Sequence, residues 1–470
     1  MQAILDEKEG LLAGAALDNN AAPRVELSRR AHLKETLLLA APVMVGQLGM
    51  VLMGLQDNLM VGWVSQVHLS ASALGNSIYF ILLVLGFGVT YAITPLVSEA
   101  VGAGKSMDSA RFLRQGVWVT IITGLVLMAL VEACVWLLPY MGQPPLEAEM
   151  AGTYLRIMNV ATIPMLMFGA YRQYCDGLGD TRTGMVVTII GLLANIVLNW
   201  MLIFGKWGAP RMELDGAAWG TVGAKLIMMG LIMAYVHYGR AYRQYMLGEG
   251  SWSINWAEVR RLFAMGIPVG FQFFFEVAAF GGAAIMMGWL DNPDTARSAH
   301  TIAMSIASVT FMFASGLAAG SSVRVGNYYG MRDSAGMQRA AAVALWLCAA
   351  IMAGCALLFV LFRYEIPAWY GAENNELAET AAALCIFAAC FQIFDGTQVV
   401  ASAILRGRQD IRFATIAMFI AHWLVSLPLS YLLAFVLGWG VYGFWFSFVV
   451  SLALAAGLLT WRVWRLRHVA

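Results

Sequence analysis

Residues 71–96 read ASALGNSIYFILLVLGFGVTYAITPL, and none of these 26 side chains carries a charge. A helix needs about 20 apolar residues to cross the hydrocarbon core of a membrane, so this stretch predicts a spanning helix. The whole chain has the same character, because 60% of its 470 residues are apolar and only 12% are charged. A soluble protein of this size needs a polar surface that such a sequence cannot supply. The composition therefore excludes a soluble globular enzyme, a disordered protein and a secreted disulfide scaffold.

Charge and cysteine usage exclude two further classes of protein. The net charge is +1, which provides no basic field for nucleic acid. The six cysteines lie in or beside apolar runs and form no CxxC pair, so they are interpreted as small buried hydrophobic residues. We expect no disulfide framework, no cysteine metal site and no cofactor.

Twelve apolar stretches have the length of a membrane span, and their backbone polar groups must be satisfied within lipid, which predicts helices. The predicted spans are residues 36–62, 71–96, 113–139, 151–172, 184–205, 215–238, 258–289, 298–323, 338–362, 376–403, 412–437 and 440–462. Residues 1–35 are polar and are predicted to be a cytoplasmic tail rather than a cleaved signal. The predicted fold class is an all-α integral membrane protein.

Basic residues predict the orientation of these spans. Of the 29 Lys and Arg residues, 23 fall in the two termini and in alternate loops, whereas five fall on the other side. Basic loops face the cytoplasm, so both termini are predicted to be cytoplasmic, as twelve spans require. The expected location is the bacterial inner membrane.

An internal repeat divides the chain into two halves. A shift of 226 residues places Pro42-Val43 on Pro268-Val269, and a shift of 230 places residues 177–182 (GLGDTR) on residues 407–412 (GRQDIR). Each half holds six spans, an even number, so both halves insert in the same direction. This indicates a parallel repeat about a pseudo-twofold axis along the membrane normal.

The repeat predicts two six-helix bundles that face each other across a central cavity. Residues 36–239 form the N-lobe, residues 240–257 a cytoplasmic linker, and residues 258–470 the C-lobe with a short cytoplasmic tail. This architecture is typical of an alternating-access carrier, whereas a channel more often surrounds a pore with identical subunits.

Three carboxyl groups lie inside predicted spans, where an ionisable group is costly and is by default a functional candidate. They are Asp57 in the first span, Glu276 in the seventh and Asp395 in the tenth. Burial disfavours the charged form unless a cation is bound, so each group could load and release a proton or ligate Na⁺. The alternative is a structural hydrogen bond to a neighbouring helix.

Four amides are further candidates. Asn195 and Asn199 are four residues apart and share a helix face, so they could form an oxygen-rich pocket with Asp57. The alternative, amides that join helices to each other, is equally favoured by the sequence. Gln47 and Gln272 follow the repeated prolines by about one turn and could face the substrate cavity.

An ordered set of motifs resembles those of the multidrug and toxic compound extrusion (MATE) family. The acids Glu276 and Asp395 resemble a pair in its bacterial NorM-like branch. The motifs are Pro42, Gln47, Asp57 and Met60-Val61-Gly62, then residues 95–104 (PLVSEAVGAG), 177–182, Pro268, Gln272, Glu276 and residues 323–330 (VRVGNYYG). The resemblance covers residues ~30–465.

The resemblance implies an antiporter that expels cationic or amphipathic drugs in exchange for Na⁺ or H⁺, and not an enzyme. It implies that Glu276 and Asp395 bind the coupling cation in the C-lobe, and that Asp57, with Asn195 and Asn199, does so in the N-lobe. One departure is Phe391, since NorM-like proteins often have Tyr there and Phe offers no oxygen to Na⁺. We expect a monomer whose partners are small drugs and membrane lipids.

Two other functions compete with this interpretation. A related lipid-linked oligosaccharide flippase should show several cavity Arg or Lys residues for pyrophosphate, but away from the cytoplasmic clusters only Lys225 and Arg156 fall inside predicted spans. An integral-membrane enzyme would need a cluster of reactive side chains at one interface, and the six His residues are scattered without ligand spacing.

Overall fold

The fold is entirely helical wherever the chain is described. The computed structural model describes residues 28–140, 142, 144–246, 252–372 and 375–466. Most of the predicted cytoplasmic tail and part of the predicted linker lie outside these residues.

The first half of the chain forms six membrane crossings. They are α2 (Arg29–Gly62), α3 (Gln66–Thr90) continued by α4 (Ile93–Gly102), α5 (Ser109–Leu137), α6 (Pro145–Val160) continued by α7 (Thr162–Gly177), α8 (Thr181–Phe204) and α9 (Glu213–Tyr238). The short α10 (Arg240–Met246) leads into the second half.

The second half forms six more crossings. They are α11 (Trp256–Met286), α12 (Pro293–Gly330), α13 (Ser334–Leu361), α15 (Asn375–Gly407), a segmented crossing that starts with α16 (Ile411–Phe419) and includes α17 (Leu427–Tyr431), and α18 (Val441–Arg465). The segmented crossing is π-helical over Ile420–Ser426 and Leu432–Val436. The short α14 (Glu365–Trp369) lies between α13 and α15.

The predicted twelve-helix, two-bundle membrane fold is confirmed. Eleven helical segments of the described chain are long and apolar enough to cross a membrane. The remaining crossing is made by α6 and α7, which have 16 residues each and are interrupted at Ala161. Neither helix alone has the length of a span, but the two in succession do.

The first helix begins earlier than residue 36, where the apolar stretch begins. Ser28 has an extended backbone, and its Oγ accepts a hydrogen bond of 3.3 Å from the Ala31 N–H. A serine in this position satisfies one of the free N–H groups at a helix start. Residues 29–35, which the sequence placed in the tail, are therefore helical.

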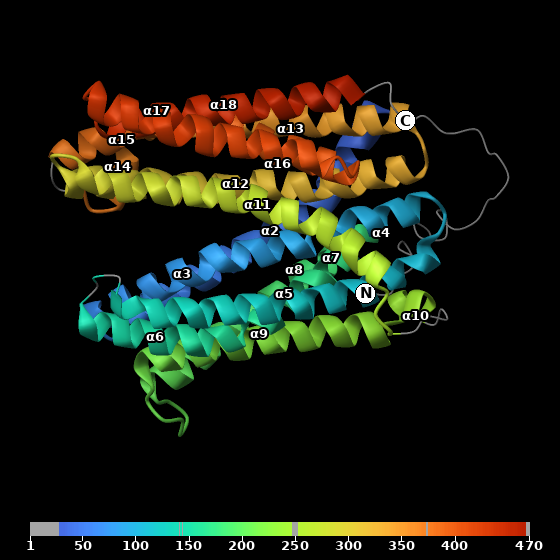
Figure 1. Cartoon of the computed structure of the whole chain (residues 1–470), viewed down its shortest axis with the longest axis horizontal. Coiled ribbons are helices and arrows are strands. Elements are labelled where there is room, and N and C mark those ends of the chain that lie inside the picture. The colour runs from blue at the N-terminus through green and yellow to red at the C-terminus, as the bar shows by residue number, and fades with distance from the viewer. Residues whose placement is uncertain (1–27, 141, 143, 247–251, 373–374, 467–470) are drawn as a thin grey trace.

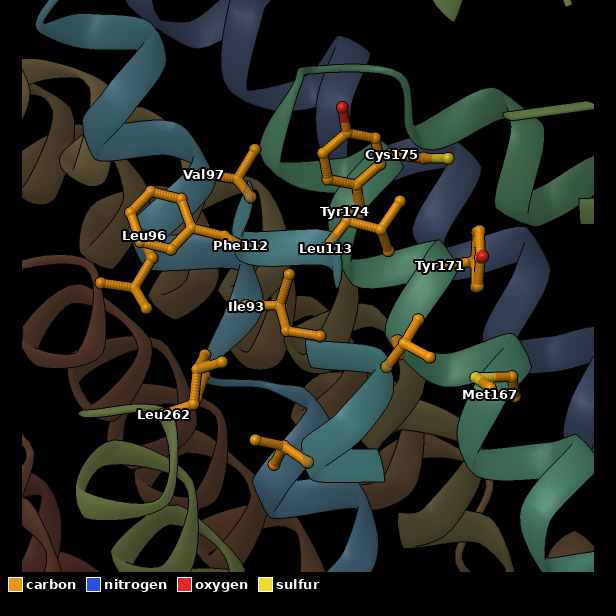
Figure 2. Packing of buried hydrophobic residues seen from close by; sticks show 14 of the residues in the cluster. Ile93, Leu96, Val97, Phe112, Leu113, Met167, Tyr171, Tyr174, Cys175 and Leu262 are labelled. Carbon is orange, nitrogen blue, oxygen red and sulfur yellow. The ribbon is translucent and has the colours of Figure 1, made fainter. Parts of the chain in front are cut away.

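The two halves form two layers, and they exchange the starts of their first helices (Figure 1). The start of α11 packs into the first-half core, where Leu262 lies with Leu96 of α4 and Phe112 of α5 (Figure 2). In the same way Ala40 of α2 belongs to the core of the second half, beside Leu317 of α12. The exchange follows the repeat, because α2 and α11 are the equivalent first helices of the two halves.

Both described termini lie at one end of the molecule (Figure 1). His32 and Leu466 accept backbone hydrogen bonds from Arg324 and Arg408, which stand near the ends of α12 and α15. We call this the basic end, and it carries Arg182, Arg261, Arg324, Arg408 and Arg465.

Two polar clusters join the lobes at the basic end. In the first, the buried guanidinium of Arg324 donates to the Thr36 hydroxyl at 2.7 Å and to the Glu35 carboxylate at 2.9 Å. In the second, the Glu99 carboxylate accepts from Arg261 at 3.3 Å and from Gln409 at 2.6 Å. Each cluster pairs an acid from the first half with a base from the second.

Glycine also lets the lobes approach each other closely where α3 meets α11. A Cβ on Gly270 of α11 would lie 2.6 Å from the Leu85 carbonyl oxygen of α3, and a Cβ on Gly88 would collide with the Gly270 backbone. Backbone cannot swing aside as a side chain can. These positions therefore need glycine if α3 and α11 are to remain in contact.

We predict that Gly270→Ala destabilises the protein, because overpacking a tight contact costs about 1–3 kcal/mol. Gly281→Ala on the same helix is the control, since a Cβ there meets nothing within 4 Å. Thermal unfolding of both purified variants in detergent measures the difference. Equal melting temperatures would show that the α3–α11 contact does not depend on glycine.

Candidate functional site

The structure brings Asp57 together with side chains from two other helices of the first half. The Asp57 carboxylate on α2 accepts a hydrogen bond of 2.5 Å from the Asn199 amide on α8. Its second oxygen accepts one of 3.0 Å from the Thr221 hydroxyl on α9. Asp57 remains partly exposed, whereas Asn199 is fully buried. We call this group, with Asn195, the N-lobe site.

Asn195 completes the N-lobe site. It donates to the Thr221 hydroxyl at 3.3 Å, and it is fully buried one turn before Asn199 on α8. The amide oxygens of Asn195 and Asn199 have no hydrogen-bond partner within the described chain. A buried oxygen without a donor is costly, so these two atoms indicate a place where a donor or a cation can be accepted.

The sequence did not find Thr221, and it gave Lys225 no partner. These residues are four apart on α9, so they share one helix face. The Lys225 ammonium is 5% exposed and lies 3.1 Å from the Met53 sulfur and 3.8 Å from the Met50 sulfur on α2. A search for polar residues four apart within spans, as applied to Asn195 and Asn199, could have identified this pair.

The N-lobe site is rich in hard oxygen atoms. A carboxylate, a hydroxyl and two amide oxygens suit a small hard cation or a proton better than a transition metal. The described residues contain no group of three His, Cys, Asp or Glu side chains placed to hold a metal ion.

In the second half, Glu276 of α11 and Asp395 of α15 form a carboxyl pair. Both are buried, and the two carboxyl groups lie close enough to interact electrostatically. Two neighbouring carboxylates in one buried site cannot both remain ionised, so the pair must hold a proton or accept a cation. One Asp395 oxygen has no partner within the described chain. We call this pair the C-lobe site.

The surroundings of Phe391 are apolar, which suits a phenylalanine at the position where the sequence resemblance leads us to expect a tyrosine. Phe391 is buried one turn before Asp395, with its ring centroid 5.7 Å from those of Phe280 and Trp445. An aromatic wall therefore occupies the position where related proteins often have a tyrosine oxygen. This side of the C-lobe site offers no ligand to a cation.

Other buried polar groups flank the C-lobe site. Gln392 and Gln398 lie three residues either side of Asp395 on α15, and both ends of each amide lack partners within the described chain. The same is true of both ring nitrogens of His422, in the π-helical stretch Ile420–Ser426. These buried groups leave unmet hydrogen-bonding capacity around the C-lobe site.

The two cavity candidates lie in different environments. Gln47 of α2 donates to the Ser315 hydroxyl of α12 at 3.3 Å, so it bridges the lobes. Gln272 is buried within the second half, where it donates to the Thr415 hydroxyl at 2.9 Å and accepts from Ser402 at 2.8 Å. Its amide is committed to neighbouring helices, which favours a structural role.

Taken together, these features define a class of protein. Twelve helices in two repeat-related lobes, with carboxyl groups inside the spans of both lobes, are the features of a membrane transporter.

The chain belongs to the MATE family. The MatE family model matches residues 42–201 and again residues 268–432. The two matches start 226 residues apart, at Pro42 and Pro268, which confirms the repeat expected from the sequence.

Bacterial relatives extend the match over almost the whole chain. The "Multidrug resistance protein NorM" of Aliivibrio fischeri is 32% identical over 431 residues, which cover 90% of this chain and 93% of that protein. The "Multidrug resistance protein MdtK" of Yersinia pseudotuberculosis is 31% identical and covers 92% of this chain and 94% of its own length. The chain is thus a bacterial NorM-like MATE protein.

Solved structures share the fold. The structure titled "Outward-facing conformation of a multidrug resistance MATE family transporter of the MOP superfamily" has a TM-score of 0.84 at 18% identity. The match covers 95% of this chain and 99% of that one.

We predict that Gly220→Ala disrupts the N-lobe site. A Cβ at this position on α9 would collide with the Asn199 amide oxygen, so the amide must leave Asp57. Gly230→Ala on the same helix is the control, because a Cβ there meets nothing within 4 Å. Efflux by both variants, at matched amounts of folded protein, measures the effect. Normal efflux by Gly220→Ala would show that Asn199 need not contact Asp57.

Proposed function

We propose that this protein is a cation-coupled multidrug efflux antiporter of the bacterial inner membrane, with both termini cytoplasmic. It exports cationic or amphipathic compounds in exchange for H⁺ or Na⁺, and it needs no covalent chemistry. The observation that carries the proposal is the presence of carboxyl groups inside the membrane spans of both lobes, at Asp57 among buried amides and at the buried Glu276–Asp395 pair.

Buried carboxyl groups supply the coupling. Inside a membrane protein, an ionised carboxyl must be neutralised by a proton, a metal cation or a cationic guest. Export then depends on a difference between two conformations in their affinity for drug and cation. This coupling is reciprocal. The factor by which a bound cation changes the affinity for drug equals the factor by which bound drug changes the affinity for the cation.

The packing of the lobes supports alternating access. The cross-lobe clusters around Arg324 and Glu99 lie at the basic end, and the two layers diverge toward the opposite end (Figure 1). With the basic end on the cytoplasmic side, this arrangement corresponds to an outward-facing state. The relatives with similar sequences carry multidrug resistance names, which supports drugs as the cargo.

The geometry does not favour the flippase alternative. Arg156, one of the two basic residues that remained for pyrophosphate, is bound by Glu132 at 3.1 Å and lies on the surface. Lys225 is buried against methionine sulfurs. Neither side chain forms part of a basic cavity.

The test is efflux of a cationic dye from proteoliposomes with Na⁺ and pH gradients imposed separately. We expect at least one gradient to drive efflux. Asp57→Asn, Glu276→Gln and Asp395→Asn should each weaken coupling by about 5–150-fold, the usual range for linked sites. The control is Glu132→Gln, which alters a surface acid already paired with Arg156 and should retain coupling. Failure of both gradients across a panel of cationic dyes would refute the antiporter proposal.

A further inference from the structure

We propose that Lys225 is the built-in cation of the N-lobe site, which neutralises ionised Asp57 and excludes Na⁺ from this lobe. The inference rests on the proposed antiport function, and it assigns this lobe to protons. It concerns a residue whose environment is unusual, since a buried ammonium normally has oxygen partners.

Helix spacing places Lys225 beside the site. On α2, Met53 precedes Asp57 by one turn, and on α9, Thr221 precedes Lys225 by one turn. Thr221 donates to Asp57 at 3.0 Å, while Lys225 approaches Met53 at 3.1 Å. The same faces of α2 and α9 therefore meet over two successive turns, with the ammonium one turn from the carboxylate. The two charges interact electrostatically.

The atoms around Lys225 explain why it can exchange partners. Methionine sulfur is a weak acceptor, so the contacts to Met50 and Met53 hold an ammonium loosely. The amide oxygens of Asn195 and Asn199 have no donor within the described chain. The ammonium can donate three hydrogen bonds, and these oxygens are the type of acceptor that it lacks in its present position.

Counting charges shows the consequence for Na⁺. Ionised Asp57 and protonated Lys225 give the N-lobe site a net charge of zero. Adding Na⁺ would leave one uncompensated positive charge in a buried site, which is strongly disfavoured. A proton on Asp57 leaves the same net charge of +1, but a covalent O–H bond holds it without a set of oxygen ligands, whereas Na⁺ depends on electrostatic attraction to such ligands. Without the Lys225 charge, the same oxygen atoms would form a site for Na⁺.

The experiment measures Na⁺ binding to purified protein, without transport. All variants carry Glu276→Gln and Asp395→Asn, which remove the acids of the C-lobe site. Binding is followed with radioactive ²²Na⁺ and by the rise in melting temperature as NaCl replaces choline chloride at constant ionic strength. In this background we expect no Asp57-dependent Na⁺ binding.

Adding Lys225→Met should create Na⁺ binding, with an apparent affinity about tenfold or more above the background protein, as for other coupled sites. Methionine matches the length of the lysine stem and the chemistry of its neighbours. The further change Asp57→Asn should abolish the gain. Lys225→Arg, which keeps the charge, should not produce it, and Lys225→Gln serves as a second neutral variant if Lys225→Met does not fold.

Two results would overturn the inference. One is Asp57-dependent Na⁺ binding while Lys225 is present, and the other is unchanged Na⁺ binding in both neutral variants. Neither result depends on dye efflux. If the wild type fails to transport under both gradients, the antiporter proposal is refuted instead, so the two failures can be told apart.

Discussion

The cost of a carboxyl charge inside a membrane is the constraint on which this structure depends. Asp57 is surrounded by two amides and a hydroxyl, and Glu276 lies beside a second buried acid. The two lobes compensate their carboxyl groups in chemically different ways. The N-lobe site carries its own cation in Lys225, whereas the acid pair of the C-lobe site has no basic partner described and must share a proton or accept an external cation. One fold thus holds two sites of unequal charge.

The repeat also organises the contact between the lobes. The shift of 226 residues that relates Pro42 to Pro268 also relates Glu35 to Arg261. In the same register Glu99 falls one residue from Arg324, and these four residues form the two ion pairs at the basic end. The halves share a backbone but carry opposite charges at equivalent places. Complementary charge favours a specific pairing of the lobes and disfavours the pairing of identical halves.

Most of the fold could be predicted from sequence because the membrane imposes strong, local rules. Span length, basic loops and the spacing of motifs gave twelve helices in two parallel halves, as the structure shows. Interruptions such as Ala161 and the π-helical stretch Ile420–Ser426 escaped prediction, because tertiary packing decides where a helix changes its hydrogen bonding. The early start of α2 escaped because a capping serine extends a helix beyond its apolar part.

The candidate sites were predictable only in part. An acid within a span stands out from one residue, so Asp57, Glu276 and Asp395 were found and the structure places each among buried polar partners. Asn195 and Asn199 were candidates because residues four apart lie on one face of a helix, where both could approach Asp57. Thr221 has no distinguishing feature in the sequence, because its contact with Asp57 depends on how α9 packs against α2. Gln272 is a candidate for the substrate cavity from sequence, and only the structure could show its hydrogen bonds to Ser402 and Thr415.

The most direct test of the central claim is to count cations during drug binding by the purified protein. In weakly buffered detergent solution, a cationic dye should release protons when Na⁺ is absent, or displace ²²Na⁺ when it is present. The account predicts that this release disappears when Asp57, Glu276 and Asp395 are all replaced by their amides. Dye binding that leaves both proton and Na⁺ occupancy unchanged in the unmodified protein would contradict it.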